Sequence, residues 1–189
     1  MKRWALFLAA VSALGADSHL VEGNPASPVR VVIFEDLQCP DCADFRAMLD
    51  RELLPRFGEK VAFEHHDFPL AKHAWARKAA IAARFLETIS PVLAVEFRKT
   101  VMADQPKISV ETFDTYWAGF AKSHGVDAAQ ASAALADSAL AALVERDYQD
   151  GVARGIARTP TVLVDGEPFI ETFPLSGIVK SIEREIALH

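Results

Sequence analysis

Cysteine is scarce in this sequence, and long apolar runs and clusters of basic residues are missing from it. Only two cysteines occur among 189 residues, which excludes a framework of several structural disulfides. The 20 Lys and Arg residues are outnumbered by 26 Asp and Glu residues, and the basic residues form no stripe along the chain. We therefore expect no nucleic-acid partner. The composition, 51% hydrophobic and 24% charged, is that of one globular domain with a substantial core.

The N-terminal residues have the pattern of a secretory signal peptide. Lys2 and Arg3 precede an apolar stretch of about 11 residues, roughly half of what a membrane-spanning helix needs. A small-x-small triplet follows at residues 13–15. We predict a cleaved signal peptide over residues 1–15, with an uncleaved apolar tail as the alternative. The expected product is a soluble periplasmic or otherwise extracytoplasmic protein, in a compartment where disulfides persist.

The first part of the remaining chain predicts strand, helix, strand and a long helical block. Residues 16–28 contain two prolines and no periodicity, so we interpret them as a linker. The β-branched, almost wholly apolar residues 29–34 predict a central strand, and residues 60–68 predict a second strand. Residues 71–157 are rich in alanine and have spaced apolar positions, which predicts several packed helices.

Strand character returns near the C-terminus. Residues 161–164 predict a strand, the pair Asp165-Gly166 predicts a tight hairpin turn, and residues 169–173 predict the partner strand. A closing helix is expected over residues 175–187. This order of elements predicts an α/β fold, a mixed sheet with helices on its faces.

The two cysteines form a Cys-x-x-Cys motif directly after the first of these predicted strands. A strand that leads into Cys39-Pro40-Asp41-Cys42 and then a helix puts Cys39 at or beside the N-cap, where free N–H groups and the helix dipole stabilise a thiolate. Pro40 falls near the first helical position, where proline is well tolerated. We expect a lowered pKa for an exposed, nucleophilic Cys39 and a shielded Cys42 that resolves the mixed disulfide.

Two other roles of the cysteine pair are open. A zinc site needs four ligands, and histidines would have to supply two of them. His73 is one candidate, but strand alternation points His65 and His66 to opposite faces. A purely structural disulfide is the second alternative, although so short a loop constrains the unfolded chain little. We therefore expect no bound metal and no cofactor besides a redox-active Cys39–Cys42 disulfide.

Several short segments occur together in a distinctive order. They are residues 32–42 (VIFEDLQCPDC), 68–70 (FPL), 73–74 (HA), 158–161 (RTPT) and 164–166 (VDG). In this combination, from Val29 to the C-terminus, the chain resembles the DsbA-like thiol:disulfide oxidoreductases of the thioredoxin superfamily. The resemblance implies a thioredoxin fold over residues 29–189, with a helical domain inserted at about residues 71–157.

The resemblance also assigns residues around the cysteines. It implies that Pro160 follows a cis peptide bond and that its loop lies against the disulfide; from the residues alone, Pro160 could equally start an edge strand. The backbone at Thr159 could then pair with an extended substrate chain. Asp41 stands where the family often has histidine, and Arg158 where a small residue is common, so both add charge beside the thiols.

One further carboxylate is a candidate for the site. Glu35 ends the predicted central strand near the cysteines. There it would either relay protons during exchange or serve as a solvated or capping carboxylate.

These observations predict an exported, monomeric oxidoreductase that exchanges disulfides with protein thiols and is favoured as an oxidase. The resemblance implies a quinone-linked membrane protein as its reoxidant. A disulfide reductase or isomerase is the nearest alternative. A metallochaperone that holds Cu(I) on the two thiolates is an alternative from another class, with Met102 as a third soft ligand that no motif places near the cysteines.

Overall fold

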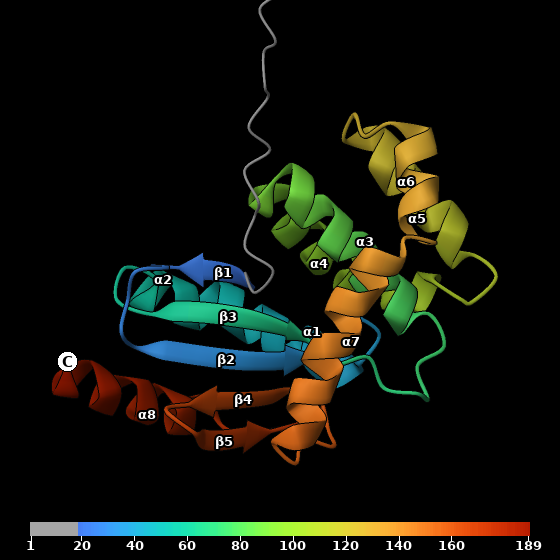
Figure 1. The fold of residues 1–189 in the computed structure, drawn as a ribbon. Coiled ribbons are helices and arrows are strands. Elements are labelled where there is room, and N and C mark those ends of the chain that lie inside the picture. Colours follow the sequence, from blue (N-terminus) through green and yellow to red (C-terminus); the bar gives the residue numbers. More distant parts are fainter. Residues whose placement is uncertain (1–18) are drawn as a thin grey trace, which may run out of the picture.

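The computed structural model describes residues 19–189, so the predicted signal peptide over residues 1–15 lies outside the described part of the chain. Five strands form one sheet in the order β1-β3-β2-β4-β5 (Figure 1). Of the paired strands, β2 and β3 run parallel, and the other neighbours are antiparallel. The strands are β1 (Leu20–Gly23), β2 (Arg30–Glu35), β3 (Ala62–Asp67), β4 (Thr161–Val164) and β5 (Glu167–Ile170).

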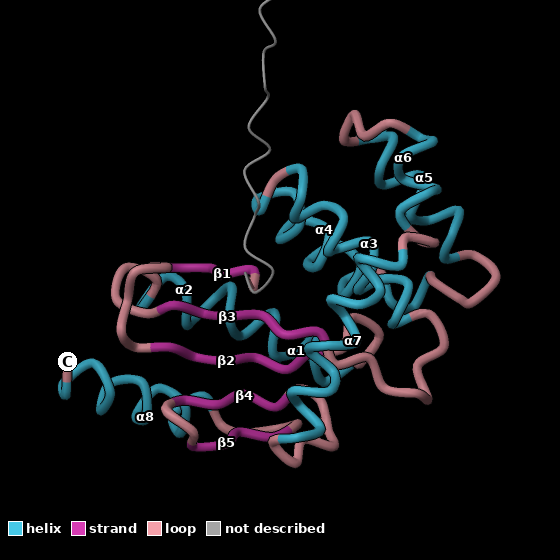
Figure 2. The backbone as a smooth tube through the Cα atoms, in the orientation of Figure 1, coloured by secondary structure: helices cyan, strands magenta, loops and turns pink. Residues whose placement is uncertain are grey.

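The helices fall into two groups. Those that follow β2 and β5 cover the sheet, and they are α1 (Pro40–Met48), the π-helical turn η1 (Leu49–Leu53), α2 (Leu54–Phe57) and α8 (Leu175–Leu188). Those between β3 and β4 form the insertion beyond the carboxyl ends of β2 and β3 (Figure 2), and they are α3 (Ala76–Ile89), α4 (Pro91–Ala103), the 3-10 turn η2 (Gln105–Lys107), α5 (Phe113–Ser123), α6 (Ala128–Ala134) and α7 (Ser138–Ala153). This arrangement agrees with the predicted α/β fold.

The two groups of helices have separate apolar cores. Val31 and Ile33 of β2 are fully buried and belong to a cluster with Phe45 of α1 and Ile178 of α8. A second cluster fills the insertion around Trp117, and both cysteines lie at its edge. Within residues 19–189, none of the helices combines the length and the apolar character that crossing a membrane requires.

The segment predicted to be a linker, residues 16–28, contains a strand. Leu20–Gly23 pairs antiparallel with β3, with Leu20 opposite His65. A strand of four residues is too short to give a clear pattern in the sequence. In the structure Leu20 is 4% exposed and packs into the core of the insertion. The linker interpretation is therefore wrong for these four residues.

The hairpin near the C-terminus differs from the prediction in register. The partner strand was expected at residues 169–173 but spans Glu167–Ile170. Asp165 and Gly166 both have positive φ, 47° and 82°, so two residues are enough to turn the chain and Val164 faces Glu167.

Gly151 of α7 packs against the rings of Phe68 and Phe34, so a substitution there tests the packing of α7 on the sheet. A Cβ atom there would lie 2.6 Å from the ring of Phe68, which is buried and stacked on Tyr148. We expect Gly151→Ala to lower the free energy of unfolding by about 1–3 kcal/mol, because the ring cannot move away. Gly119→Ala is the control, since nothing lies within 4 Å of its added methyl group. That substitution should stabilise the helix by about 0.5–1 kcal/mol in the same urea titration. Equal effects of the two substitutions would contradict the packing.

Candidate active site

Cys39 occupies the N-cap of α1, and Pro40 is the first residue of the helix, as the motif predicted. Cys39 has an extended backbone, with φ −78° and ψ 124°, and its carbonyl accepts hydrogen bonds from the N–H groups of Cys42 and Ala43 at 3.1 and 3.2 Å. The Cys39 sulfur lies at the helix N-terminus, where the backbone N–H groups of Cys42 and Asp41 act to lower its pKa. Such a position stabilises negative charge on the sulfur.

The two cysteines are free thiols in this structure, and their environments differ. The pKa of Cys39 is lowered to about 6, mainly because the Cys42 thiol donates a hydrogen bond to its sulfur. The pKa of Cys42 is raised, mainly by burial and then by Cys39. Cys39 was expected to be exposed, but it is only 5% exposed, against 1% for Cys42. Cys39 therefore lies in the wall of a cleft and not on an open surface.

The loop before β4 lies against Cys39. The Cys39 thiol donates to the carbonyl oxygen of Thr159 at 3.2 Å, and the Thr159–Pro160 peptide bond is cis, as the resemblance implies. The Thr159 hydroxyl is buried and has no hydrogen-bond partner among residues 19–189. This loop thus forms one wall of the site.

The cleft beside Cys39 has a volume of about 570 Å³ and a mixed charge. Asp41 and Glu171 line it together with the basic side chains of Lys72 and Arg158. Arg158 donates to Glu171 at 2.7 Å, so its charge is shared with a partner that the sequence did not reveal. A residue 13 positions away along the chain gives no local signal, and only the β4–β5 hairpin brings the two together.

Glu35 lies behind the cysteines in a buried ionic network. It is 3% exposed and accepts hydrogen bonds from His65 at 2.9 Å and from Arg98 at 3.0 Å. Burial acts to raise the pKa of Glu35, but the charges of His65 and Arg98 outweigh it, so this pKa is lowered. Glu35 is therefore an ionised, buried carboxylate, and it is neither solvated nor a helix cap.

Asp36, the next residue, makes hydrogen bonds to the segment that contains Cys42 and to the segment that follows β3. Its N–H group points at the Cys42 sulfur at 3.4 Å. Its carboxylate accepts hydrogen bonds from the N–H groups of Gln38 and Leu70, both at 2.7 Å, and from the His73 ring at 2.8 Å. Burial raises the pKa of Asp36. The residue connects the cysteine loop to the segment that follows β3.

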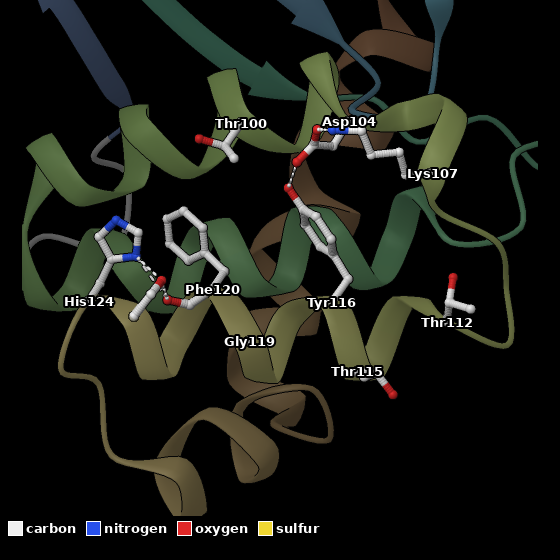
Figure 3. A pocket seen from close by; sticks show the side chains of 10 residues that line it. Thr100, Asp104, Lys107, Thr112, Thr115, Tyr116, Gly119, Phe120 and His124 are labelled. Carbon is white, nitrogen blue, oxygen red and sulfur yellow. Dashed lines mark hydrogen bonds and ion pairs between the residues drawn. The ribbon is translucent and has the colours of Figure 1, made fainter.

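A second cavity, of about 520 Å³, lies between α4 and α5 (Figure 3). The Tyr116 hydroxyl in its wall donates to Asp104 at 3.2 Å, and the His124 ring contacts the Phe120 carbonyl at 2.8 Å. Neither cysteine lines this cavity, so we place the chemistry at the Cys39 cleft.

Comparisons with known proteins agree with this geometry. Residues 16–184 match the model of the thioredoxin family. Oxidised BdbD from Bacillus subtilis has a TM-score of 0.80 at 23% identity, with 89% of this chain and 93% of BdbD covered. The thiol-disulfide exchange protein alpha-DsbA2 from Wolbachia pipientis has a TM-score of 0.75 at 18% identity, with 88% and 87% covered. The predicted thioredoxin fold, similar to that of DsbA-like proteins, is thus confirmed.

One curated relative is a larger protein of another kind. The Na(+)/H(+) antiporter NhaA 1 of Mycolicibacterium gilvum is 24% identical over 167 residues. The match covers 86% of this chain but 26% of the antiporter, so the chain spans about a quarter of that relative's length.

The two thiols should differ in reactivity as their surroundings do. In the reduced protein, iodoacetamide should label Cys39 at a rate that rises with pH around a midpoint of about 6, because only the thiolate reacts. Cys42 should stay unlabelled at neutral pH. Cys42→Ala removes the thiol that donates to Cys39 and should move the midpoint upward, whereas Cys42→Ser keeps a donor and should move it less. Mass spectrometry of the labelled peptides decides this, and earlier labelling of Cys42 would contradict the assignment.

Proposed function

The chain belongs to the thioredoxin family, and we propose that it is a thiol:disulfide oxidoreductase that acts on protein thiols through Cys39 and Cys42. One observation carries this proposal: a cysteine of lowered pKa sits at a helix N-cap, against the Thr159 loop, in the wall of an open cleft. The similarity to alpha-DsbA2, a thiol-disulfide exchange protein, supports it. The comparisons give no support to the Cu(I)-binding alternative.

The proposed reaction starts from the Cys39–Cys42 disulfide. A substrate thiolate attacks the Cys39 sulfur, the Cys39–Cys42 bond breaks, and Cys42 leaves and takes up a proton. A second substrate thiolate then attacks the substrate sulfur of the mixed disulfide and releases Cys39 as a thiolate. Two substrate thiols are thereby oxidised to one disulfide, and the enzyme disulfide is reduced to a dithiol.

The lowered pKa of Cys39 supports the oxidase direction. A thiol of low pKa is a good leaving group, and a stabilised thiolate favours the reduced form of the enzyme. The disulfide of such an enzyme is a strong electron acceptor, which supports an oxidase over a reductase or isomerase. In the second step, the Thr159 backbone and the mixed charges of the cleft would hold an extended substrate segment next to Cys39.

The proposal extends to location and partners. The signal-like N-terminus supports export to an extracytoplasmic compartment, where the disulfide product persists. There the monomer would hand its electrons to a quinone-linked membrane protein, as its resemblance to DsbA-like proteins implies.

Trapping of the intermediate tests the proposed reaction. Cys42→Ala should accumulate mixed disulfides between Cys39 and oxidised substrate proteins, because its Cys39 thiolate can still attack a substrate disulfide, the reverse of the second step above, and no Cys42 thiol is present to release the substrate. Cys39→Ala is the control and should accumulate none. Wild-type oxidised protein should also restore disulfides in a reduced, unfolded test protein, followed as regained activity of that protein. If Cys42→Ala traps nothing, or Cys39→Ala traps equally, the proposed roles are wrong.

Asp41 should make this protein a milder oxidant than a variant with histidine in its place. A negative charge about 6 Å from a thiolate disfavours it by roughly 0.7 kcal/mol in water and about 2.8 kcal/mol at an effective dielectric constant of 20. Because about 1.4 kcal/mol corresponds to 30 mV, Asp41→His should raise the reduction potential by about 15–60 mV, nearer the lower value because Asp41 is partly exposed. Arg158 cannot cancel Asp41, since it pairs with Glu171.

Equilibration with glutathione buffers measures this effect. Asp44→His makes the same change at an exposed position of the same helix and should shift the potential by much less. If Asp41→His leaves the reduction potential unchanged or lowers it, the charge of Asp41 does not control the reduction potential of the Cys39–Cys42 disulfide.

A further inference from the structure

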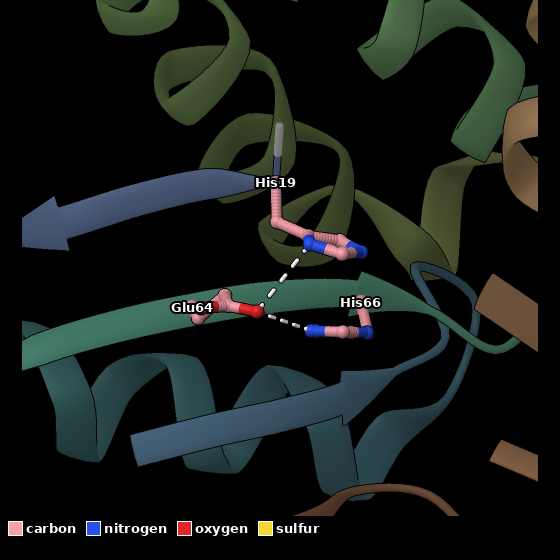
Figure 4. Close-up of side chains that lie close together, drawn as sticks. All are labelled: His19, Glu64 and His66. Atoms are coloured by element: carbon pink, nitrogen blue, oxygen red, sulfur yellow. Dashed lines mark hydrogen bonds and ion pairs between the residues drawn. The ribbon is translucent and has the colours of Figure 1, made fainter. Parts of the chain in front are cut away.

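The sheet face that lies away from α8 is polar over β3. Glu64 and His66 are both on this face, since alternate residues of a strand point to the same side. His66 contacts Glu64 at 2.7 Å, and the His19 ring stacks on His66 with centroids 3.7 Å apart (Figure 4). Polar side chains therefore cover this part of the face.

The same face becomes apolar over β4 and β5. The strand register places Val32 of β2 beside Glu64, Leu163 of β4 beside Val32, and Pro168 of β5 beside Leu163. Ile170 follows two residues after Pro168 in β5, the outermost strand (Figure 1), and is 46% exposed. An apolar strip thus reaches the edge of the sheet.

A groove of about 460 Å³ lies over this strip. Leu163, Pro168 and Ile170 line it from the sheet, and residues 154–158, which follow α7, line it from the other side. A concave site of this size with mainly apolar walls can enclose a large side chain such as that of phenylalanine.

The arginines in the wall of the groove already have partners. Arg154 donates to Asp150 at 2.8 Å, and Arg158 donates to Glu171 at 2.7 Å. Since these charges are paired outside the apolar strip, the groove suits an apolar group better than an ion.

The groove continues into the cleft that holds Cys39. Ala157 and Arg158 line both of them, and the next residue, Thr159, accepts a hydrogen bond from the Cys39 thiol at 3.2 Å. A substrate segment that pairs with the Thr159 backbone and stays extended would run past Arg158 and Ala157 into the groove. Because an extended chain rises about 3.3 Å per residue, the groove begins about two residues from the reacting cysteine of the substrate.

We propose that this groove binds a large apolar side chain of the substrate polypeptide, about two to four residues from the cysteine that reacts with Cys39. The inference rests on the proposed function and specifies its substrates as segments of unfolded or partly folded proteins. Folded proteins bury most of their large apolar side chains, whereas an unfolded chain exposes them beside its cysteines. The groove would therefore direct the enzyme to chains that have not finished folding.

Short peptides with a single cysteine test the groove on the full chain carrying Cys42→Ala. The peptide cysteine is activated as a mixed disulfide with thionitrobenzoate, so attack of the Cys39 thiolate on the peptide sulfur forms a Cys39–peptide disulfide and releases the coloured thiolate. Phenylalanine replaces serine at one position at a time on either side of the cysteine. The rate is measured against peptide concentration.

Phenylalanine at about two to four residues on one side of the cysteine should lower the half-saturating peptide concentration by about five-fold or more. The limiting rate should change little, because the groove holds the bound peptide and does not touch the reacting sulfurs. Phenylalanine on the other side of the cysteine should have a much smaller effect.

Ile170→Asp should remove the preference for phenylalanine, because a charge in the groove disfavours an apolar side chain. The ratio between the phenylalanine and serine peptides cancels any change in the reactivity of Cys39. Ile89→Asp is the matched control and should keep the ratio, since Ile89 is 49% exposed at the end of α3 and does not line the groove. Melting temperatures establish that both variants fold, and the peptide comparison on the unchanged groove decides the matter should Ile170→Asp fail to fold.

Equal half-saturation by phenylalanine and serine peptides at every position would overturn the proposal. The same ratio in Ile170→Asp and Ile89→Asp would also overturn it, as would a stable dimer that Ile170→Asp dissociates, because a second copy would then occupy the groove. If no activated peptide reacts with Cys39, the proposed function itself is wrong.

Discussion

The buried guanidinium of Arg98 ties the helical insertion to the ends of the two central parallel strands. Arg98 is 1% exposed and donates to Glu35 at the end of β2, to Asp67 at the end of β3 and to Glu87 of α3. A charge so far from water is tolerated only when several acceptors surround it, and loss of one partner from such a pair costs about 3–5 kcal/mol. The insertion and the sheet are therefore fixed to each other at the level of the active site.

A second buried arginine, Arg84, extends these ion pairs to helix α7. Arg84 pairs with Asp67 and with Asp147, and Asp147 also accepts the N–H group of Asp67 and contacts His19. The carboxyl ends of β2 and β3, α3, α4 and α7 thus share one set of charges. Because each ion satisfies more than one neighbour, the arrangement specifies a single packing of the insertion against the sheet.

Sequence patterns predicted what depends on neighbours along the chain. Cys39 at the N-cap and Pro40 at the first helical position follow from four consecutive residues, and the cis bond before Pro160 followed from family resemblance. The missed features join distant residues: Arg98 and Glu35 are 63 positions apart, and His19 and Asp147 are 128 apart. The periodicity of apolar residues along the sequence cannot predict contacts between residues so far apart. Strand alternation did separate His65 from His66, and the same alternation places His66 on the face of Glu64.

The buried ions also lie close enough to the cysteines to affect the pKa of Cys42. Arg98 and His65 keep Glu35 ionised behind the cysteines. Burial is the main reason that the pKa of Cys42 is raised, and the charges of Cys39 and Glu35 raise it further, so Cys42 keeps its proton. That protonated thiol donates to Cys39 and is the largest cause of the lowered pKa of Cys39. Burial and the hydrogen bond between the two sulfurs therefore set most of the pKa difference between the cysteines, and the ionised Glu35 adds to it from behind.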